Sequence, residues 1–110
     1  MNKLPVPARF TRTTIAELDN LPNAGVYIIA YLGCVLYVGK SGCDVCGRLR
    51  LHLTKPSQLG AWLRRVEDWG NVRLDVLEAP FSDDFQVWLT KAEDALIHRF
   101  KPLFNMQLMA

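Results

Sequence analysis

The sequence has no strong excess of either charge. Among its 110 residues, 13 are basic and 11 acidic, so the formal net charge is only +2. A bulk charge of this size does not by itself indicate a nucleic-acid-binding protein. The distribution is less even, because seven basic but only three acidic residues fall between positions 40 and 73. We therefore expect any phosphate-binding surface in this middle third.

The sequence also has few features of a membrane or secreted protein. One uncharged stretch, between Asp19 and Lys40, approaches the roughly 20 residues of a membrane-spanning helix. However, it contains turn-forming residues at 21–25, Gly33, and many β-branched and aromatic residues, which favour strands. No apolar run follows the first residues as in a secretory signal, and three cysteines, an odd number, fit a reducing compartment. We expect a cytoplasmic protein without a membrane segment.

Internal repeats, linkers and low-complexity segments are absent, and the 50% hydrophobic content supports one modest core. We expect a single domain at residues 21–110, preceded by a lead-in segment at residues 1–20. Within that segment, residues 14–17 have the form of a capping box, which predicts a short helix.

Periodicity predicts six further elements. Two β-rich runs, at 25–31 and 34–38, flank Leu32-Gly33 and indicate an antiparallel hairpin, and alternation at 72–76 indicates a third strand. Apolar residues at helical spacing predict helices from Asp44 to about Lys55, from Ser57 to near Trp69, and from Asp83 to Phe100. The order α-β-β-α-α-β-α predicts an α/β (α+β) fold, in which helices flank a small three-stranded antiparallel sheet.

One carboxylate of the last predicted helix falls at the edge of its apolar stripe. On a helical wheel Glu93 borders the apolar arc, whereas Asp94 points to solvent. A carboxylate at that border is partly desolvated and needs a partner. Two interpretations are open: an ion pair with Arg99 or Arg48, or a ligand for Mg²⁺, which takes one or two carboxylates and keeps several waters.

Other candidate residues are ordinary when taken one at a time. Arg48 and His52 are four residues apart and share a helical face, which can be a solvated basic face. Tyr27 and Tyr37 lie on adjacent predicted strands, where tyrosine is common. Residues 39–42, at a strand end, can bring backbone amides and a lysine to a phosphate, or form a simple turn.

Taken in order, these residues resemble the GIY-YIG nuclease superfamily, and within it the amino-terminal incision domain of the bacterial nucleotide-excision-repair nuclease. The matching positions are Gly25-Val26-Tyr27, Tyr37-Val38-Gly39, Lys40, Arg48, His52, Glu93 and Asn105. The resemblance runs from about Leu21 to Asn105, and valine replaces isoleucine in both triplets, which preserves β-branched packing.

The resemblance implies a metal-dependent DNA endonuclease. It assigns catalytic roles to Tyr27, Tyr37, Arg48, His52, Glu93 and Asn105, phosphate binding to Gly39 and Lys40, and the metal-ligand role, for one Mg²⁺ or Mn²⁺, to Glu93. It nominates Tyr27 as the base, provided that nearby positive charge lowers its pKa. We expect single-strand nicking of DNA, with RNA left open as a substrate. The biological role stays open between DNA repair, restriction and a mobile element, and a homodimer or a partner protein could supply target specificity.

Two other interpretations are open. Cys34, Cys43, Cys46 and His52 could form a zinc site with CxxC spacing, which would withdraw His52 from catalysis. Alternatively, the protein is a non-catalytic nucleic-acid-binding module that acts with a partner, although binding alone needs no metal carboxylate.

Overall fold

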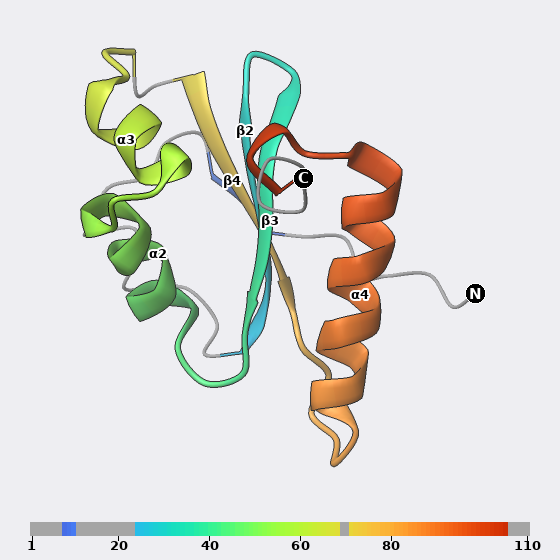
Figure 1. The fold of residues 1–110 in the computed structure, drawn as a ribbon. Helices are drawn as coiled ribbons and strands as arrows, with labels where there is room; N and C mark the ends of the chain where they lie inside the picture. Colours follow the sequence, from blue (N-terminus) through green and yellow to red (C-terminus); the bar gives the residue numbers. More distant parts are fainter. Residues whose placement is uncertain (1–7, 11–23, 69–70, 106–110) are drawn as a thin grey trace.

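The fold is a small antiparallel sheet with helices on both faces (Figure 1). The computed structural model describes residues 8–10, 24–68 and 71–105. Its elements are β1 (Ala8–Phe10), β2 (Gly25–Tyr31), β3 (Cys34–Ser41), α2 (Val45–Thr54), α3 (Gln58–Arg65), β4 (Val72–Glu78) and α4 (Phe85–Phe100). The strand order is β1-β4-β2-β3, so β3 is an edge strand. Among the described residues, no helix is long and apolar enough to cross a membrane.

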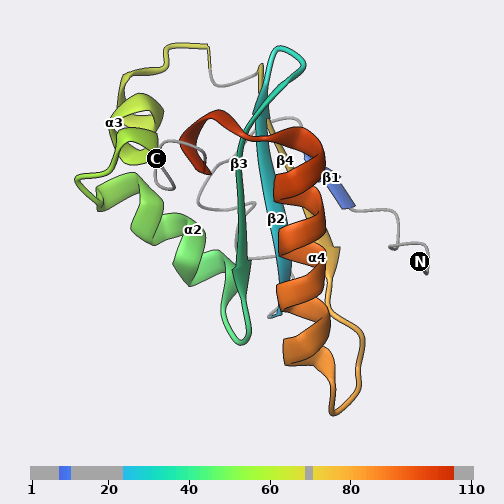
Figure 2. The same ribbon diagram turned by 45° about the vertical axis from the view of Figure 1, so that its right-hand side comes forward.

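Two apolar clusters hold the layers together. On one face of the sheet, α2 and α3 bury side chains such as Val45, Leu49 and Leu63 against the strands. On the other face, α4 buries Leu89 and Leu96. Figure 2 shows α2 and α4 on opposite sides of β3. Side chains from both helical layers can therefore meet at this edge of the sheet.

The predicted three-stranded sheet and the helices α2, α3 and α4 are confirmed, except that α3 ends at Arg65 rather than near Trp69, and one strand is added. β1 pairs antiparallel with β4, with Ala8 opposite Val76 and Phe10 opposite Leu74. Sequence periodicity did not predict β1 because three residues are too few to show alternation. The helix predicted at residues 14–17 lies outside the described residues.

The turn between β2 and β3 has the geometry that such a hairpin needs. Leu32 and Gly33 have φ angles of 49° and 81°. Positive φ at both central residues is the type I′ turn, whose twist matches that of the flanking strands. Glycine adopts this conformation without a steric penalty. The hairpin predicted from Leu32-Gly33 is confirmed.

A bulge in β3 changes the direction of its side chains. Tyr37 pairs with Ile29, but Val35 pairs with the next residue of β2, Ala30, so Leu36 is an extra residue in β3. Leu36 and Tyr37 both pack against the cluster on the α2 and α3 face. A regular strand would have sent them to opposite faces. The bulge thus aims Tyr37 toward α2.

The link between α2 and α3 is short, and each of these helices begins with a side-chain cap. Asp44 caps α2 by accepting a hydrogen bond from the Gly47 amide at 2.8 Å, and Ser57 caps α3 by accepting from the Gly60 amide at 3.0 Å. A methyl group at Gly60 would overlap the backbone carbonyl oxygen of His52. The start of α3 therefore lies directly against the last turn of α2.

Candidate active site

Tyr27 reaches across β3 to contact α2. It pairs with Gly39 of β3, and a methyl group at Gly39 would overlap the Tyr27 hydroxyl and ring. Because Gly39 has no side chain, the Tyr27 phenol can pass over its backbone and reach His52. The Tyr27 hydroxyl lies 2.9 Å from His52 Nε2. Gly39 is thus buried beneath Tyr27, and its phosphate-binding role stays a prediction.

Three rings from three elements form one cluster. The ring centroids of Tyr37 and His52 are 4.9 Å apart, those of Tyr27 and His52 are 5.9 Å apart, and the two tyrosine rings are 6.2 Å apart. Tyr27 is 1% exposed and His52 7%, whereas Tyr37 is only half-buried. Tyr37 is therefore the ring of this cluster that a ligand can approach most easily.

Burial sets the protonation of the Tyr27–His52 pair. It lowers the pKa of His52 to about 4, and the positive charges of Lys55 and Arg48 add to this shift. Burial also raises the pKa of Tyr27 well above its ordinary value, with a further increase from Tyr37 and an opposing effect of Arg48. At neutral pH the imidazole is neutral and the phenol is protonated. The Tyr27 hydroxyl is the donor of the 2.9 Å hydrogen bond to His52 Nε2 in the tautomer that carries the imidazole proton on Nδ1.

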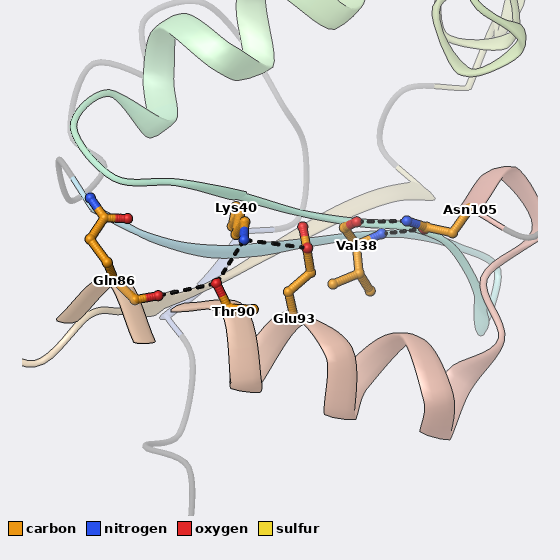
Figure 3. A network of polar contacts seen from close by, with 6 residues as sticks. All are labelled: Val38, Lys40, Gln86, Thr90, Glu93 and Asn105. Carbon is orange, nitrogen blue, oxygen red and sulfur yellow. Dashed lines mark hydrogen bonds and ion pairs between the residues drawn. The ribbon is translucent and has the colours of Figure 1, made fainter. Parts of the chain in front are cut away.

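Lys40 and Glu93 meet on the side of β3 that faces α4. Lys40 Nζ lies 4.0 Å from Glu93 Oε1 and donates a hydrogen bond to the Thr90 hydroxyl at 2.9 Å, as Figure 3 shows. Burial raises the pKa of Glu93, while Lys40 acts in the opposite direction. The ion-pair partner in the structure is thus Lys40 rather than Arg99 or Arg48, the partners considered from the sequence.

Thr90 is a site residue that sequence reasoning missed. It precedes Glu93 by three residues on α4, so both side chains lie on one helical face. Its hydroxyl accepts from Lys40 and donates to the Gln86 carbonyl oxygen (Figure 3). The i,i+3 spacing from Glu93 was the available signal. Thr90 holds the Lys40 ammonium beside the carboxylate.

Asn105 completes the outer edge of β3. Its side-chain carbonyl accepts from the Val38 amide at 2.8 Å, and its amide nitrogen donates to the Val38 carbonyl at 2.9 Å (Figure 3). The side chain is 7% exposed, and its partner is 67 residues away in the sequence. Asn105 thus replaces a neighbouring strand between Tyr37 and Gly39, and its catalytic role stays a prediction.

Arg48 connects the two sides of the site. It is exposed on the first turn of α2, and its charge favours the ionised forms of Tyr37 and Glu93, lowering both pKa values against the larger effect of burial. The structure therefore gathers the predicted site residues around β3. Tyr27, Tyr37 and His52 lie on one face, Lys40 and Glu93 on the other, and Asn105 along the edge.

The donor set fits a hard divalent cation better than zinc. Among the described residues, no group of three or more His, Cys, Asp or Glu side chains could hold a metal ion. Cys34, Cys43, Cys46 and His52 therefore do not form the zinc site considered above. Glu93 offers one carboxylate beside polar groups and solvent, which suits Mg²⁺ because that ion keeps several waters and shares its shell with phosphates.

Comparison with known proteins gave one match. No family model matches the chain, and the comparison with curated proteins found no match. Among solved structures, the chain is similar to the GIY-YIG N-terminal endonuclease domain of UvrC from Thermotoga maritima, a point mutant bound to its catalytic divalent cation. The TM-score is 0.60 at 20% identity, over 82% of this chain and 92% of that one. This chain therefore has the fold of a GIY-YIG endonuclease domain.

Proposed function

We propose that this protein is a DNA endonuclease that hydrolyses phosphodiester bonds with one divalent cation, Mg²⁺ or Mn²⁺, and nicks one strand at a time. The observation that supports this most is the gathering of Glu93, Lys40, Tyr37 and the Tyr27–His52 pair around the edge of β3. The similar domain of UvrC is an endonuclease domain with a catalytic divalent cation. A single site in one domain favours nicking over simultaneous double-strand cleavage.

Each polar group of the site has a use in phosphodiester hydrolysis. Glu93 would hold the cation, which would supply polarisation of the scissile phosphate and stabilisation of the leaving oxygen. Lys40 then exchanges Glu93 for a phosphate oxygen, which its partly exposed side chain allows. Arg48 remains charged at every physiological pH and offsets the negative charge that develops on the phosphoryl oxygens.

The Tyr27–His52 hydrogen bond supplies a route for the proton of the attacking water. Because burial raises the pKa of Tyr27, the deprotonated form of its phenol is not populated before the substrate binds. Tyr27 instead accepts the proton of water as it passes its own proton to His52 Nε2, 2.9 Å away. Tyr37, half-buried beside both rings, orients the water. The sequence-based expectation was that nearby positive charge lowers the pKa of Tyr27 until it can act as the base. In this scheme the phenol instead passes its proton to a neutral histidine.

Replacement of Glu93 tests the proposal directly. Glu93→Gln should abolish nicking of supercoiled DNA in Mg²⁺ and leave the thermal unfolding temperature close to that of the wild type. The control is Asp94→Asn, the same chemical change at the exposed neighbouring position, which should keep activity within about threefold of wild type. Full activity of Glu93→Gln, or of the wild type in excess chelator, would contradict the proposal.

One observation supports a second candidate. Lys40 already neutralises Glu93, as a purely structural ion pair would. In that case the protein binds DNA through its basic surface, and a partner performs the cleavage. Salt-sensitive DNA binding without any Mg²⁺-dependent product would favour this function.

A further inference from the structure

A groove opens directly beside the candidate active site. It lies between the last turn of α2, the start of α3 and the chain after α4, and it encloses about 430 Å³. This volume falls within the roughly 300–1,000 Å³ of typical ligand sites. Tyr37 and His52 belong both to the groove and to the ring cluster of the active site. Whatever occupies the groove is therefore next to the reacting groups.

The walls of the groove suit a flat aromatic ligand. Leu59 and Phe104, which are 3% and 8% exposed, form an apolar floor, and the Tyr37 ring adds an aromatic wall. Nucleobases stack on such surfaces whatever their sequence, because every base has a π face. Gln58 at the exposed rim offers an amide that can donate to and accept from a base edge. This combination fits a nucleobase better than a phosphate.

The charges along α2 indicate the path of the DNA backbone. Arg48, His52 and Lys55 are separated by four and three residues, so they form one stripe along α2 and its C-terminal cap. Lys55 lines the groove, and its charge contributes to the low pKa of His52. A strand that places its scissile phosphate near Arg48 can thus place a neighbouring phosphate near Lys55. The base between them then lies over the groove.

We propose that this groove binds one unpaired nucleobase of the DNA strand being cut, adjacent to the scissile phosphate. Lys55 contacts the next phosphate, and Gln58 borders the base. This inference rests on the proposed function and assigns it a substrate class, namely DNA with an unpaired or easily extruded nucleotide beside the cut. A paired base must first leave the helical stack, which costs free energy that a mismatched or single-stranded base does not require.

The test is a scan with abasic nucleotides. A labelled single strand with a defined cut is prepared with one abasic residue, moved position by position around that cut. Removing the base that occupies the groove should slow cleavage about tenfold, within the range measured for base–aromatic stacking, and abasic residues elsewhere should have smaller effects. A flat profile around the cut would overturn the proposal.

A variant that fills the groove ties this effect to its location. Gln58→Trp should cut the intact strand about as slowly as the wild type cuts the sensitive abasic strand, and it should no longer distinguish the two. The matched control is Val87→Trp, on the exposed surface of α4 outside the groove, which should keep the sensitivity of the wild type. If Gln58→Trp retained that sensitivity, the base would bind elsewhere and the assignment of the groove would be wrong.

A binding measurement separates this inference from the proposed function. If the wild type cuts none of these strands in Mg²⁺, the proposed function fails, and the groove is tested by binding alone. The fluorescent base 2-aminopurine is placed at one position of the strand, and each protein is added in the presence of chelator. Binding of the wild type or of Val87→Trp should change the fluorescence of this base, whereas binding of Gln58→Trp should not. An equal response from all three proteins, or none from any, would overturn the groove assignment.

Discussion

The pairing of Tyr27 with Gly39 shows how one small residue directs the side chain that we propose as the catalytic base. A side chain at position 39 would occupy the space through which the phenol passes, so the Tyr27–His52 hydrogen bond depends on glycine there. The two partners are 25 residues apart and come from β2 and α2. Loss of the hydroxyl should therefore damage proton transfer far more than folding.

Tyr27→Phe tests this separation. It keeps the ring over Gly39 but removes the donor to His52, so we expect at least about 100-fold slower cleavage, the usual minimum for acid–base catalysis. The stability cost should be about 1–2 kcal/mol, that of one buried hydrogen bond. Single-turnover nicking and urea unfolding measure the two effects.

The control for this variant is Tyr31→Phe. The Tyr31 hydroxyl donates to the Asp68 carboxylate on the exposed surface, at 2.7 and 2.6 Å from its two oxygens. Its loss should leave cleavage within about threefold of wild type. Equal losses of activity in both variants would show that the Tyr27 hydroxyl has only a structural role.

Burial of neutral His52 also makes stability depend on pH. Its pKa falls from an ordinary value of 6.5 to about 4 in the folded protein, so the unfolded chain binds the proton first as the pH drops. The stabilising contribution is present above pH 6.5 and is lost as the pH falls toward 4. We expect a loss of about 2–3 kcal/mol from this group, since each pKa unit corresponds to about 1.4 kcal/mol.

His52→Gln isolates that contribution from the carboxylates that titrate in the same range. Glutamine accepts a hydrogen bond from Tyr27 but does not titrate. Urea unfolding at pH 7, 5.5 and 4.5 should show the wild type losing more stability than the variant, with the difference growing toward pH 4.5. If the two proteins lost the same free energy of unfolding between pH 7 and 4.5, His52 would be protonated in the folded protein as readily as in the unfolded chain.

The sequence was enough to select the candidate site residues, but it could not predict their contacts. The resemblance selected Tyr27, His52 and Glu93 because it depends on order along the chain. Helical spacing placed Glu93 at the border of an apolar face, where it lies half-buried. Neither the spacing nor the order of residues determines how two strands are paired. The pairing of Tyr27 with Gly39 and the ion pair of Glu93 with Lys40 were therefore seen only in the structure.

At the scale of elements, β3 is the centre of the site. Being an edge strand, it leaves backbone groups on its outer side to be paired by something other than a strand. Asn105 pairs two of them, both from Val38. Tyr37 and Gly39 flank Val38 directly, so this side chain fixes the part of β3 on which the site is built.

Asn105→Ala should therefore weaken both the edge and the activity. Removing two buried hydrogen bonds to Val38 should cost about 1–3 kcal/mol. Cleavage should fall about tenfold or more, since small displacements of catalytic groups cost up to about 100-fold. Hydrogen exchange of the Val38 amide, which should become faster, gives a readout independent of catalysis.

A surface asparagine provides the comparison for this variant. Asn71 donates to the Asp68 carboxylate at 3.1 Å in an exposed position. Asn71→Ala should leave both cleavage and exchange at Val38 unchanged. Unchanged exchange in Asn105→Ala would mean that solvent replaces the amide without loss and that Asn105 does not fix β3.

Local patterns predicted the longer regular elements but missed the short strand β1 and the irregular features. The caps at Asp44 and Ser57 and the positive φ angles at Leu32 and Gly33 are encoded in adjacent residues, so these boundaries were predictable. The bulge at Leu36 depends on how two strands pair, and periodicity within one strand does not contain that information.

At the scale of the whole molecule, the layers determine where the substrate can lie. α2 and α4 lie on opposite faces of the sheet and both reach the edge at β3. Lys40, Arg48 and Lys55 are brought to this edge, while the net charge of the chain stays at +2. We therefore expect DNA binding through a few local phosphate contacts rather than through a broad basic surface.

The salt dependence of binding measures the number of these contacts. Three phosphate contacts predict that the logarithm of the association constant falls with the logarithm of salt concentration with a slope of about −3 on duplex DNA. Fluorescence anisotropy in chelator with Glu93→Gln, which frees Lys40 from its ion pair, avoids cleavage. Lys55→Gln should reduce the magnitude of the slope by about one, whereas Lys91→Gln, on the exposed surface of α4, should not change it. A slope steeper than about −6 would require a phosphate-binding surface well beyond the edge of β3.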